Sequence, residues 1–169
     1  MPQVTAIYAH HVLHGLASFE EVPPTLEEMR ERRLALARLG FPFLVARRAD
    51  RVVGYAYAAG YRPRPAYRYT VEDSVYVAPG HGGRGIGLPL LAALVARCEA
   101  GPWRQMVAVI GDSGNAGSLA LHRRAGFRPV GTLTGVGFKL GRWVDSVLMQ
   151  RTLGAGAADP PDDARGGAR

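Results

Sequence analysis

The sequence predicts a mixed α/β domain in which helices flank a mostly antiparallel sheet. A chain of 169 residues has room for one such domain with a sizeable core. Short segments rich in β-branched and aromatic residues follow one another closely, which indicates antiparallel hairpins. One run, Met106 to Ile110, is nearly all apolar, as is typical of a parallel strand buried on both faces. We therefore expect a single domain over residues 1–153.

The N-terminal part is predicted to be helical. Residues 3–16 have a helical pattern, and Thr25 to Arg38 form a better marked helix. Thr25 and Glu28 are spaced as a capping box, in which each side chain accepts a hydrogen bond from a free backbone N–H, and Gly40 ends the helix. Two helices are thus expected before the first strand.

Strands and helices alternate in the rest of the chain. Phe43–Arg48 and Val52–Gly60 are predicted to form a hairpin, and a long strand follows over Tyr67–Val77. A helix is expected at residues 86–99, followed by the buried strand Met106–Ile110 and a second helix at residues 115–125. A closing hairpin is expected from Phe127–Phe138 and Arg142–Leu153. From Gly154 on the chain has no apolar anchor, so residues 154–169 are expected to be disordered.

A glycine-rich loop joins the long strand to the next helix and carries the clearest functional signal. Pro79 ends the strand, and the glycines that follow are Gly80, Gly82, Gly83, Gly85 and Gly87. Glycines at a helix N-terminus let backbone N–H groups approach a ligand closely, and the helix dipole favours an anion there. The loop predicts a ligand that carries phosphate, with a flexible turn that binds nothing as the alternative.

Two common phosphate-binding loops fit this segment poorly. A P-loop ends in Gly-Lys-Ser/Thr, whereas this loop ends in Gly85-Ile86-Gly87. A dinucleotide fingerprint is formally present in Gly80, Gly82 and Gly85, with Asp112 after the next strand. However, Pro79 precedes the first glycine directly, and too little chain follows for a doubly wound sheet. The P-loop is excluded and the dinucleotide fingerprint is disfavoured.

Charge and cysteine content narrow the class of protein. The formal net charge is +7, and a basic chain can bind nucleic acid, a membrane or a polyanionic cofactor. The basic residues are scattered, and the chain lacks an aromatic-basic RNA signature, a long apolar run and a signal peptide. We therefore expect neither a nucleic-acid nor a membrane partner. Cys98 is the only cysteine, which excludes an internal disulfide and favours a buried thiol, no bound metal and a reducing cytoplasm.

The order of elements is similar to the GNAT acetyltransferase fold. The glycine loop resembles the coenzyme A loop of that family, Gln/Arg-x-x-Gly-x-Gly/Ala, with Gly85 and Gly87 as its glycines and Gly82 in place of the usual Gln or Arg. Four segments resemble the phosphinothricin and methionine sulfoximine N-acetyltransferases, namely residues 18–25, 62–77, 107–127 and 135–150. The family normally opens with a strand, so either the start codon is misplaced or an edge strand is absent, which would expose a sheet edge.

The resemblance implies acetyl-CoA as the cofactor. In the family, a backbone N–H at the end of the long strand binds the thioester carbonyl, and the glycine loop binds the pyrophosphate. Asn115 caps the following helix and would also contact the pantetheine amide. The implied cofactor contacts are Val75, Tyr76, Val77, Gly82, Gly83, Arg84, Gly85, Ile86, Gly87, Asn115 and Ser118.

Acetyl transfer to an amine needs a free lone pair, but an amino acid's ammonium group is mostly protonated near neutral pH. A carboxylate close to the amine can accept that proton. The resemblance places the base at Glu72, which shares a strand face with Ser74, whereas Asp73 points the other way. GNAT enzymes often have a tyrosine after Asn-x-x-Ser that acts as the general acid for the leaving thiolate. His122 occupies that position here, and it is either this acid or a structural residue.

The substrate is expected to be read by a basic loop. Arg62 and Arg64 lie beside Pro63 and Pro65, which stiffen the loop, and a guanidinium can bind a carboxylate with two hydrogen bonds. The resemblance implies that one of the two arginines holds an amino-acid carboxylate, while a solvated basic loop is the alternative. The predicted walls of the side-chain pocket are Phe19, Tyr67 and Phe138.

These expectations describe an acetyl-CoA-dependent N-acetyltransferase that acts on the α-amine of a small amino acid or of its sulfoximine, sulfone or phosphinic analogue. The amine would attack the thioester directly, without a covalent enzyme intermediate. The alternatives are an enzyme that acetylates protein N-termini or lysines and a coenzyme A-binding sensor without turnover. The resemblance also implies a homodimer.

Overall fold

The computed structural model describes residues 1–161. The helices are α1 (Pro2–His14), α2 (Leu26–Arg38), α3 (Gly87–Glu99) and α4 (Ala116–Arg124). The strands are β1 (Phe43–Arg48), β2 (Arg51–Gly60), β3 (Thr70–Val77), β4 (Gln105–Gly111), β5 (Arg128–Lys139) and β6 (Arg142–Thr152). Every predicted helix and strand is confirmed, and most ends agree with the prediction within one or two residues.

The strands form one sheet in the order β1-β2-β3-β4-β6-β5, and only β3 and β4 pair in parallel. This order confirms the mixed, mostly antiparallel sheet and excludes the doubly wound sheet of a dinucleotide-binding fold. Among the described residues no strand precedes α1, so β1 is an edge strand. Arg47 and Arg48 and a register shift after Ala46 lie on this edge, and charges and bulges oppose pairing with another chain.

The long third strand is shorter than predicted, because it begins at Thr70 rather than Tyr67. Pro65–Tyr67 instead form a single turn of 3-10 helix. Proline has a fixed φ and no N–H, so Pro65 suits the start of a helical turn better than a strand ladder. The basic loop at residues 61–68 is therefore longer than the sequence indicated.

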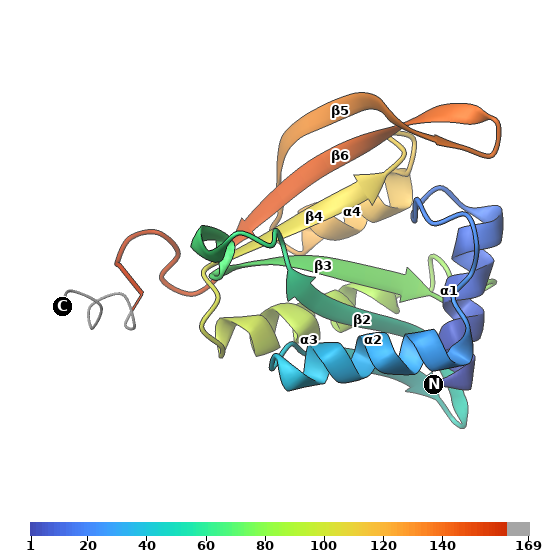
Figure 1. Cartoon of the computed structure of the whole chain (residues 1–169), viewed down its shortest axis with the longest axis horizontal. Helices are drawn as coiled ribbons and strands as arrows, with labels where there is room; N and C mark the ends of the chain where they lie inside the picture. Colours follow the sequence, from blue (N-terminus) through green and yellow to red (C-terminus); the bar gives the residue numbers. More distant parts are fainter. Residues whose placement is uncertain (162–169) are drawn as a thin grey trace.

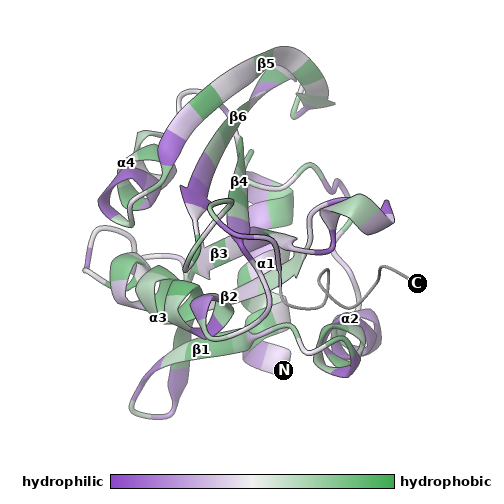
Figure 2. Ribbon diagram, turned by 90° about the vertical axis from the view of Figure 1, so that its left-hand side faces the viewer, coloured by the Kyte–Doolittle hydropathy of each residue, from purple (hydrophilic) through white to green (hydrophobic). Residues whose placement is uncertain are grey.

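Helices cover both faces of the sheet, as Figures 1 and 2 show from two sides. α3 and α4 lie on one face, over a core that includes Val71, Leu91, Leu94, Met106 and Met149. α1 and α2 lie on the other face, over a smaller cluster that includes Val12, Met29, Tyr55 and Tyr76. Residues that alternate along a central strand therefore point into two different environments.

The sheet opens between β3 and β4. The two strands pair only over Thr70–Asp73 and Gln105–Ala108. Beyond that point β3 continues beside β2, and β4 continues beside β6, so their C-terminal ends diverge (Figure 1). The two strand edges that face each other there have no strand partner. The opening lies next to Glu72 and Asp73.

The chain after β6 has neither helix nor strand in its described part. Residues 154–161 run through turns, in which the N–H of Gly156 donates to the carbonyl of Leu153. The rest of the tail that is predicted to be disordered, residues 162–169, lies outside the described residues. Within residues 1–161, no helix has both the length and the apolar character that crossing a membrane requires.

Candidate active site

A cavity of about 320 Å³ lies where β3 and β4 diverge. Side chains from β3, β4, α4 and the loop between α1 and α2 form its walls. The residues predicted from sequence that border it are Phe19, Glu72, Val75, Tyr76, Asn115, Ser118 and His122. The structure thus brings both predicted catalytic residues and part of the predicted cofactor contacts to one cleft.

Glu72 and Asp73 reach this cleft from opposite faces of the sheet. Val71, which shares the face of Asp73, packs in the core under α3, whereas Tyr76, which shares the face of Glu72, packs against α1. The cleft therefore passes through the sheet, with Glu72 on the α1–α2 face and Asp73 on the α3–α4 face. A ligand on one face can meet a ligand on the other through this opening.

Glu72 is half-buried, and its surroundings raise its pKa. Burial is the largest cause, and the negative charge of Asp73 adds to it, while the positive charge of Arg62 opposes both. A carboxylate with a raised pKa holds a proton more readily than an ordinary glutamate does. Glu72 therefore has the position and the basicity that a general base needs.

His122 is buried in the last turn of α4, and its ring contacts Ser118 on one side and Asp73 on the other. Its Nδ1 donates to the carbonyl of Ser118 at 2.8 Å, and its Nε2 lies 3.1 Å from Oδ2 of Asp73. Burial by itself lowers the pKa of His122, but the hydrogen bond and charge of Asp73, together with the Ser118 carbonyl, outweigh it and raise the pKa. The ring of Phe127 packs edge-on against His122 at 5.1 Å.

The N-terminus of α4 also lies at the cleft and is capped by a side chain. Asn115 precedes the helix, and its side-chain oxygen accepts a hydrogen bond from the N–H of Ser118 at 3.1 Å. This confirms that Asn115 caps the helix. Both residues border the cleft, and the hydroxyl of Ser118 also lies 3.3 Å from Nδ1 of His122.

The glycine loop leads into the N-terminus of α3. Gly83 and Gly85 have φ values of 70° and 73°, which side chains other than glycine rarely adopt, and no atom comes within 4 Å of a Cβ built on either. The first residue before α3, Ile86, provides no side-chain cap, so the free N–H groups of the first turn have no side-chain partner. This cradle fits the pyrophosphate of coenzyme A.

The open edge of β3 supplies further N–H donors. Successive residues of a strand direct their N–H groups to alternate sides, and the N–H of Ala78 donates to Val53 of β2. The N–H groups of Val75 and Val77 therefore point away from β2, towards the opening. They have the direction that an oxyanion-binding donor requires.

The loop between α1 and α2 covers the α1–α2 side of the cleft, and the sequence did not indicate how it is held. The ring of Phe19 lies against Gly137, where any side chain would clash, and the buried Lys139 of β5 donates to the carbonyl of Ser18 at 2.6 Å. The hydroxyl groups of Tyr8 and Ser18 are 3.0 Å apart. Only the resemblance at residues 18–25 and 135–150 pointed to these segments.

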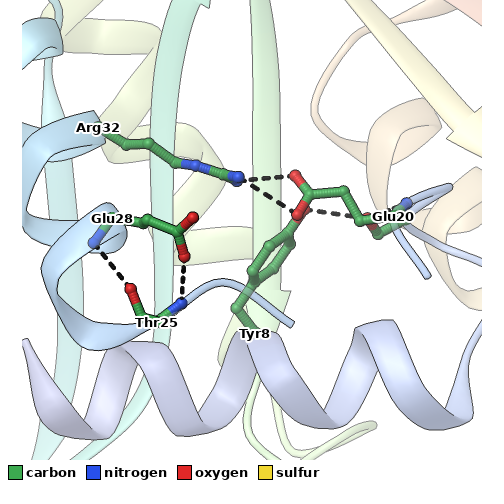
Figure 3. A network of polar contacts seen from close by, with 6 residues as sticks. Tyr8, Glu20, Thr25, Glu28 and Arg32 are labelled. Atoms are coloured by element: carbon green, nitrogen blue, oxygen red, sulfur yellow. Dashed lines mark hydrogen bonds and ion pairs between the residues drawn. The ribbon is translucent and has the colours of Figure 1, made fainter. Parts of the chain in front are cut away.

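Helix α2 holds the same loop from outside the cleft. Arg32 forms an ion pair with Glu20 at 2.7 Å, and the capping box of Thr25 and Glu28 fixes the start of α2 just after the loop (Figure 3). The ion pair is partly exposed, so it contributes little stability by itself. It connects Glu20 of the loop to Arg32 of α2.

Most of the predicted substrate residues lie outside the cleft. Arg62 and Tyr67 border a separate cavity of about 630 Å³, and Arg64 is exposed. Phe138 is 57% exposed and packs against Trp143 at 5.3 Å between ring centres. Of the five predicted substrate residues only Phe19 borders the cleft, although Arg62 is near enough to lower the pKa of Glu72.

Comparison with known proteins gives consistent matches. Residues 9–127 match the Acetyltransferase (GNAT) family. The phosphinothricin N-acetyltransferase of Alcaligenes faecalis is 58% identical over 96% of this chain and 82% of its own length. The L-methionine sulfoximine/L-methionine sulfone acetyltransferase of Pseudomonas paraeruginosa is 44% identical over 90% of this chain and 89% of its own.

Solved structures give the same picture. The structure of a GNAT superfamily phosphinothricin acetyltransferase from Sinorhizobium meliloti in complex with AcCoA superposes with a TM-score of 0.91 at 47% identity. The match covers 94% of this chain and 86% of that one. The fold and the order of elements are therefore those of the matched proteins.

Proposed function

The chain belongs to the GNAT acetyltransferase family and is an acetyl-CoA-dependent N-acetyltransferase, and we propose that its acceptor is the α-amine of a small amino acid or of its sulfoximine, sulfone or phosphinic analogue. Two relatives that match nearly the whole chain are named for such acceptors. The observation that carries the proposal is the cleft through the sheet, with Glu72 on one face and the glycine cradle of α3 on the other.

The cofactor site is formed by the chain's own backbone. The loop Gly82–Gly87 and the N-terminus of α3 would hold the pyrophosphate, and Asn115 and Ser118 would contact the pantetheine arm. Acetyl-CoA, when bound, supplies the acetyl group as a thioester. The N–H groups of Val75 and Val77 would bind the carbonyl oxygen as negative charge develops on it.

Glu72 accepts the proton of the substrate ammonium, directly or through one water, so that the amine lone pair becomes free. The amine then attacks from the α1–α2 face without a covalent enzyme intermediate. The lone Cys98 is consistent with direct transfer, because it is fully buried in α3 and burial raises its pKa to about 12. A thiol in this state is not a nucleophile at neutral pH.

Arg62 or Arg64 would bind the substrate carboxylate. The charge of Arg62 already acts on Glu72, so its guanidinium lies within electrostatic range of the amine site. Both arginines are exposed on the loop at residues 61–68, so their side chains are free to change conformation when an acceptor binds. An amino-acid substrate whose carboxylate is bound by one of them would have its α-amine directed towards Glu72.

We further propose a cytoplasmic homodimer in which the β5–β6 hairpin meets a second copy of the chain. Strand β5 is an edge of the sheet, and the large apolar residues exposed on this hairpin are Val130, Leu133, Val136, Phe138, Leu140 and Trp143. Apolar edges of this kind favour association. Analytical ultracentrifugation tests this directly, since Trp143→Glu should shift a dimer towards monomer and the exposed control Leu39→Glu, at the end of α2, should not.

Acetylation of protein N-termini or lysines is less well supported. The loop of residues 15–24 lies over the acceptor side of the cleft and is pinned by Lys139 and by the ion pair of Arg32. A flexible peptide would have to displace it. A coenzyme A sensor would have no use for a carboxylate with a raised pKa at the amine site.

The decisive experiment is a panel of amines assayed by release of free coenzyme A thiol. The panel contains amino acids, methionine sulfoximine, methionine sulfone, phosphinothricin, a lysine-containing peptide and a peptide with a free N-terminus. Turnover with the amino-acid analogues and none with the peptides supports the proposal. Turnover only with peptides, or tight cofactor binding without thiol release from any amine, would overturn it.

A further inference from the structure

A buried carboxylate, Asp73, lies against His122 and has no part in the proton transfer described above. Its side chain is 1% exposed and that of His122 is 6% exposed. One carboxylate oxygen, Oδ2, contacts His122, while the other, Oδ1, is buried without a hydrogen-bond partner among the described residues. A buried carboxylate with one partner is costly unless that partner is a cation.

The hydrogen bonds of His122 limit where its protons can be. Nδ1 lies 2.8 Å from the carbonyl of Ser118 and 3.3 Å from its hydroxyl. The nearer carbonyl can only accept, so Nδ1 carries a proton, and the hydroxyl is a weaker second acceptor. The contact of Nε2 with Asp73 then has two forms, an imidazolium beside a carboxylate or a neutral imidazole beside a carboxylic acid. The last turn of α4, where His122 lies, favours the cation because the helix dipole is negative at its C-terminal end.

We propose that Asp73 is a positioning residue that holds His122 as an imidazolium on the α3–α4 face of the cleft. The purpose of this arrangement rests on the proposed acetyltransferase function, but the protonation state of His122 is a property of the chain alone. A fixed cation on this face stands across the sheet from Glu72. It lies on the side where the cofactor cradle is, and therefore where the leaving sulfur of a bound thioester would develop negative charge.

The same carboxylate also acts on the base. Asp73 raises the pKa of Glu72, after burial, and it raises the pKa of His122 against the effect of burial. The other titratable groups that face the three residues are Arg62, which lowers the pKa of Glu72, Tyr57 beside Glu72, and Cys98 of α3, which stays neutral. One buried charge thus sets the proton affinity of groups on both faces.

The first test observes His122 in the protein without cofactor. Long-range ¹H–¹⁵N spectra of labelled protein, assigned by comparison with His122→Gln, report the protonation of each ring nitrogen. We expect both nitrogens of His122 to be protonated at pH 7, with a titration midpoint above the ordinary histidine value of about 6.5. A neutral ring at pH 7 would overturn the proposal, whether or not any amine is acetylated.

The second test uses Asp73→Asn, which keeps the shape of the side chain and removes its charge, with the exposed Asp50→Asn as the matched control. Without the carboxylate, the pKa of His122 and that of Glu72 should both fall. The acidic and the alkaline limb of kcat/KM against pH should therefore both move to lower pH, while Asp50→Asn leaves them in place.

A merely structural role for Asp73 would lower activity or stability without moving the two limbs, and that result would contradict the proposal. If Asp73→Asn does not fold, the spectra of the parent decide the question. Failure of the amine panel with a charged His122 would refute the proposed function and leave this inference standing.

Discussion

The residues Glu72 and Asp73 of β3 and the loop at residues 61–68 were both assigned to the active site by sequence, but the structure holds them in different ways. Glu72 and Asp73 lie opposite Ala59 and Ala58 of β2 in a continuous ladder, so the direction of each side chain is fixed by register. The arginines of the loop make local contacts, such as that of Arg62 with the ring of Tyr61 at 5.0 Å. If the proposed roles hold, the proton acceptor has a fixed position on the strand, whereas the arginines that would bind the acceptor can change their side-chain conformation.

Replacement of the strand carboxylate should have the largest effect. Glu72→Gln removes the base and keeps its shape, and loss of a general base costs about 10²–10⁴-fold in rate. Because the pKa of Glu72 is raised, the activity of the parent should fall as pH drops through a value above that of an ordinary glutamate, and the variant should lack this limb.

Steady-state kinetics across pH provide the measurement, with the exposed Glu31→Gln on α2 as the control. Equal kcat for Glu72→Gln and the parent at every pH would exclude Glu72 as the base.

The strand and the loop also differ in how far the sequence could predict them. Alternation along β3 predicted that Glu72 and Asp73 face opposite ways, and the capping roles of Thr25 and Asn115 were readable because a cap depends on neighbours in the chain. The contact of Asp73 with His122, 49 residues apart, was not predictable because it depends on how α4 packs on the sheet.

The contact of Lys139 with Ser18 depends in the same way on a distant hairpin, since 121 residues separate the two. The position of the loop arginines was harder still, because nothing in the sequence fixed their rotamers. Segment resemblance located these regions without giving their contacts.

The glycine cradle offers the next largest effect. Gly85→Val places a β-branched residue at a φ of 73°, and strain of this kind costs about 1–3 kcal/mol. If binding requires this backbone, acetyl-CoA affinity should fall roughly 5- to 150-fold, as measured by isothermal titration calorimetry. Gly131→Val is the control, because Gly131 lies in β5 with negative φ and open space around it. Unchanged affinity in a folded Gly85→Val would show that the loop does not hold the pyrophosphate.

A smaller effect is expected from the tether of the covering loop. Burial lowers the pKa of Lys139, and Lys139→Met keeps the length of the side chain but removes the donor to Ser18. Loss of a hydrogen bond from a charged donor costs about 1.5–3 kcal/mol net. Because Lys139 holds the loop and does not border the cleft, only part of this cost should appear in acceptor binding, which predicts a rise of about two- to tenfold in KM for the amine. Acetyl-CoA affinity, measured in parallel, should not change. If Lys139→Met weakened acetyl-CoA binding and left the KM for the amine unchanged, the loop would not lie on the acceptor side of the cleft.

The contrast between a fixed strand and an adaptable loop is tested most directly by comparing an amino acid with its carboxamide in three variants. A charge-assisted hydrogen bond to a carboxylate contributes about 1.5–3 kcal/mol, so the parent should prefer the free acid by roughly 10- to 150-fold in kcat/KM. Glu72→Gln should slow both acceptors equally and keep that preference. Arg62→Ala or Arg64→Ala should lose most of the preference for the free acid, while the acidic limb of the pH profile that Glu72 sets should remain. If neither arginine variant narrows the gap between acid and amide, or if Glu72→Gln abolishes it, the division between strand and loop is wrong.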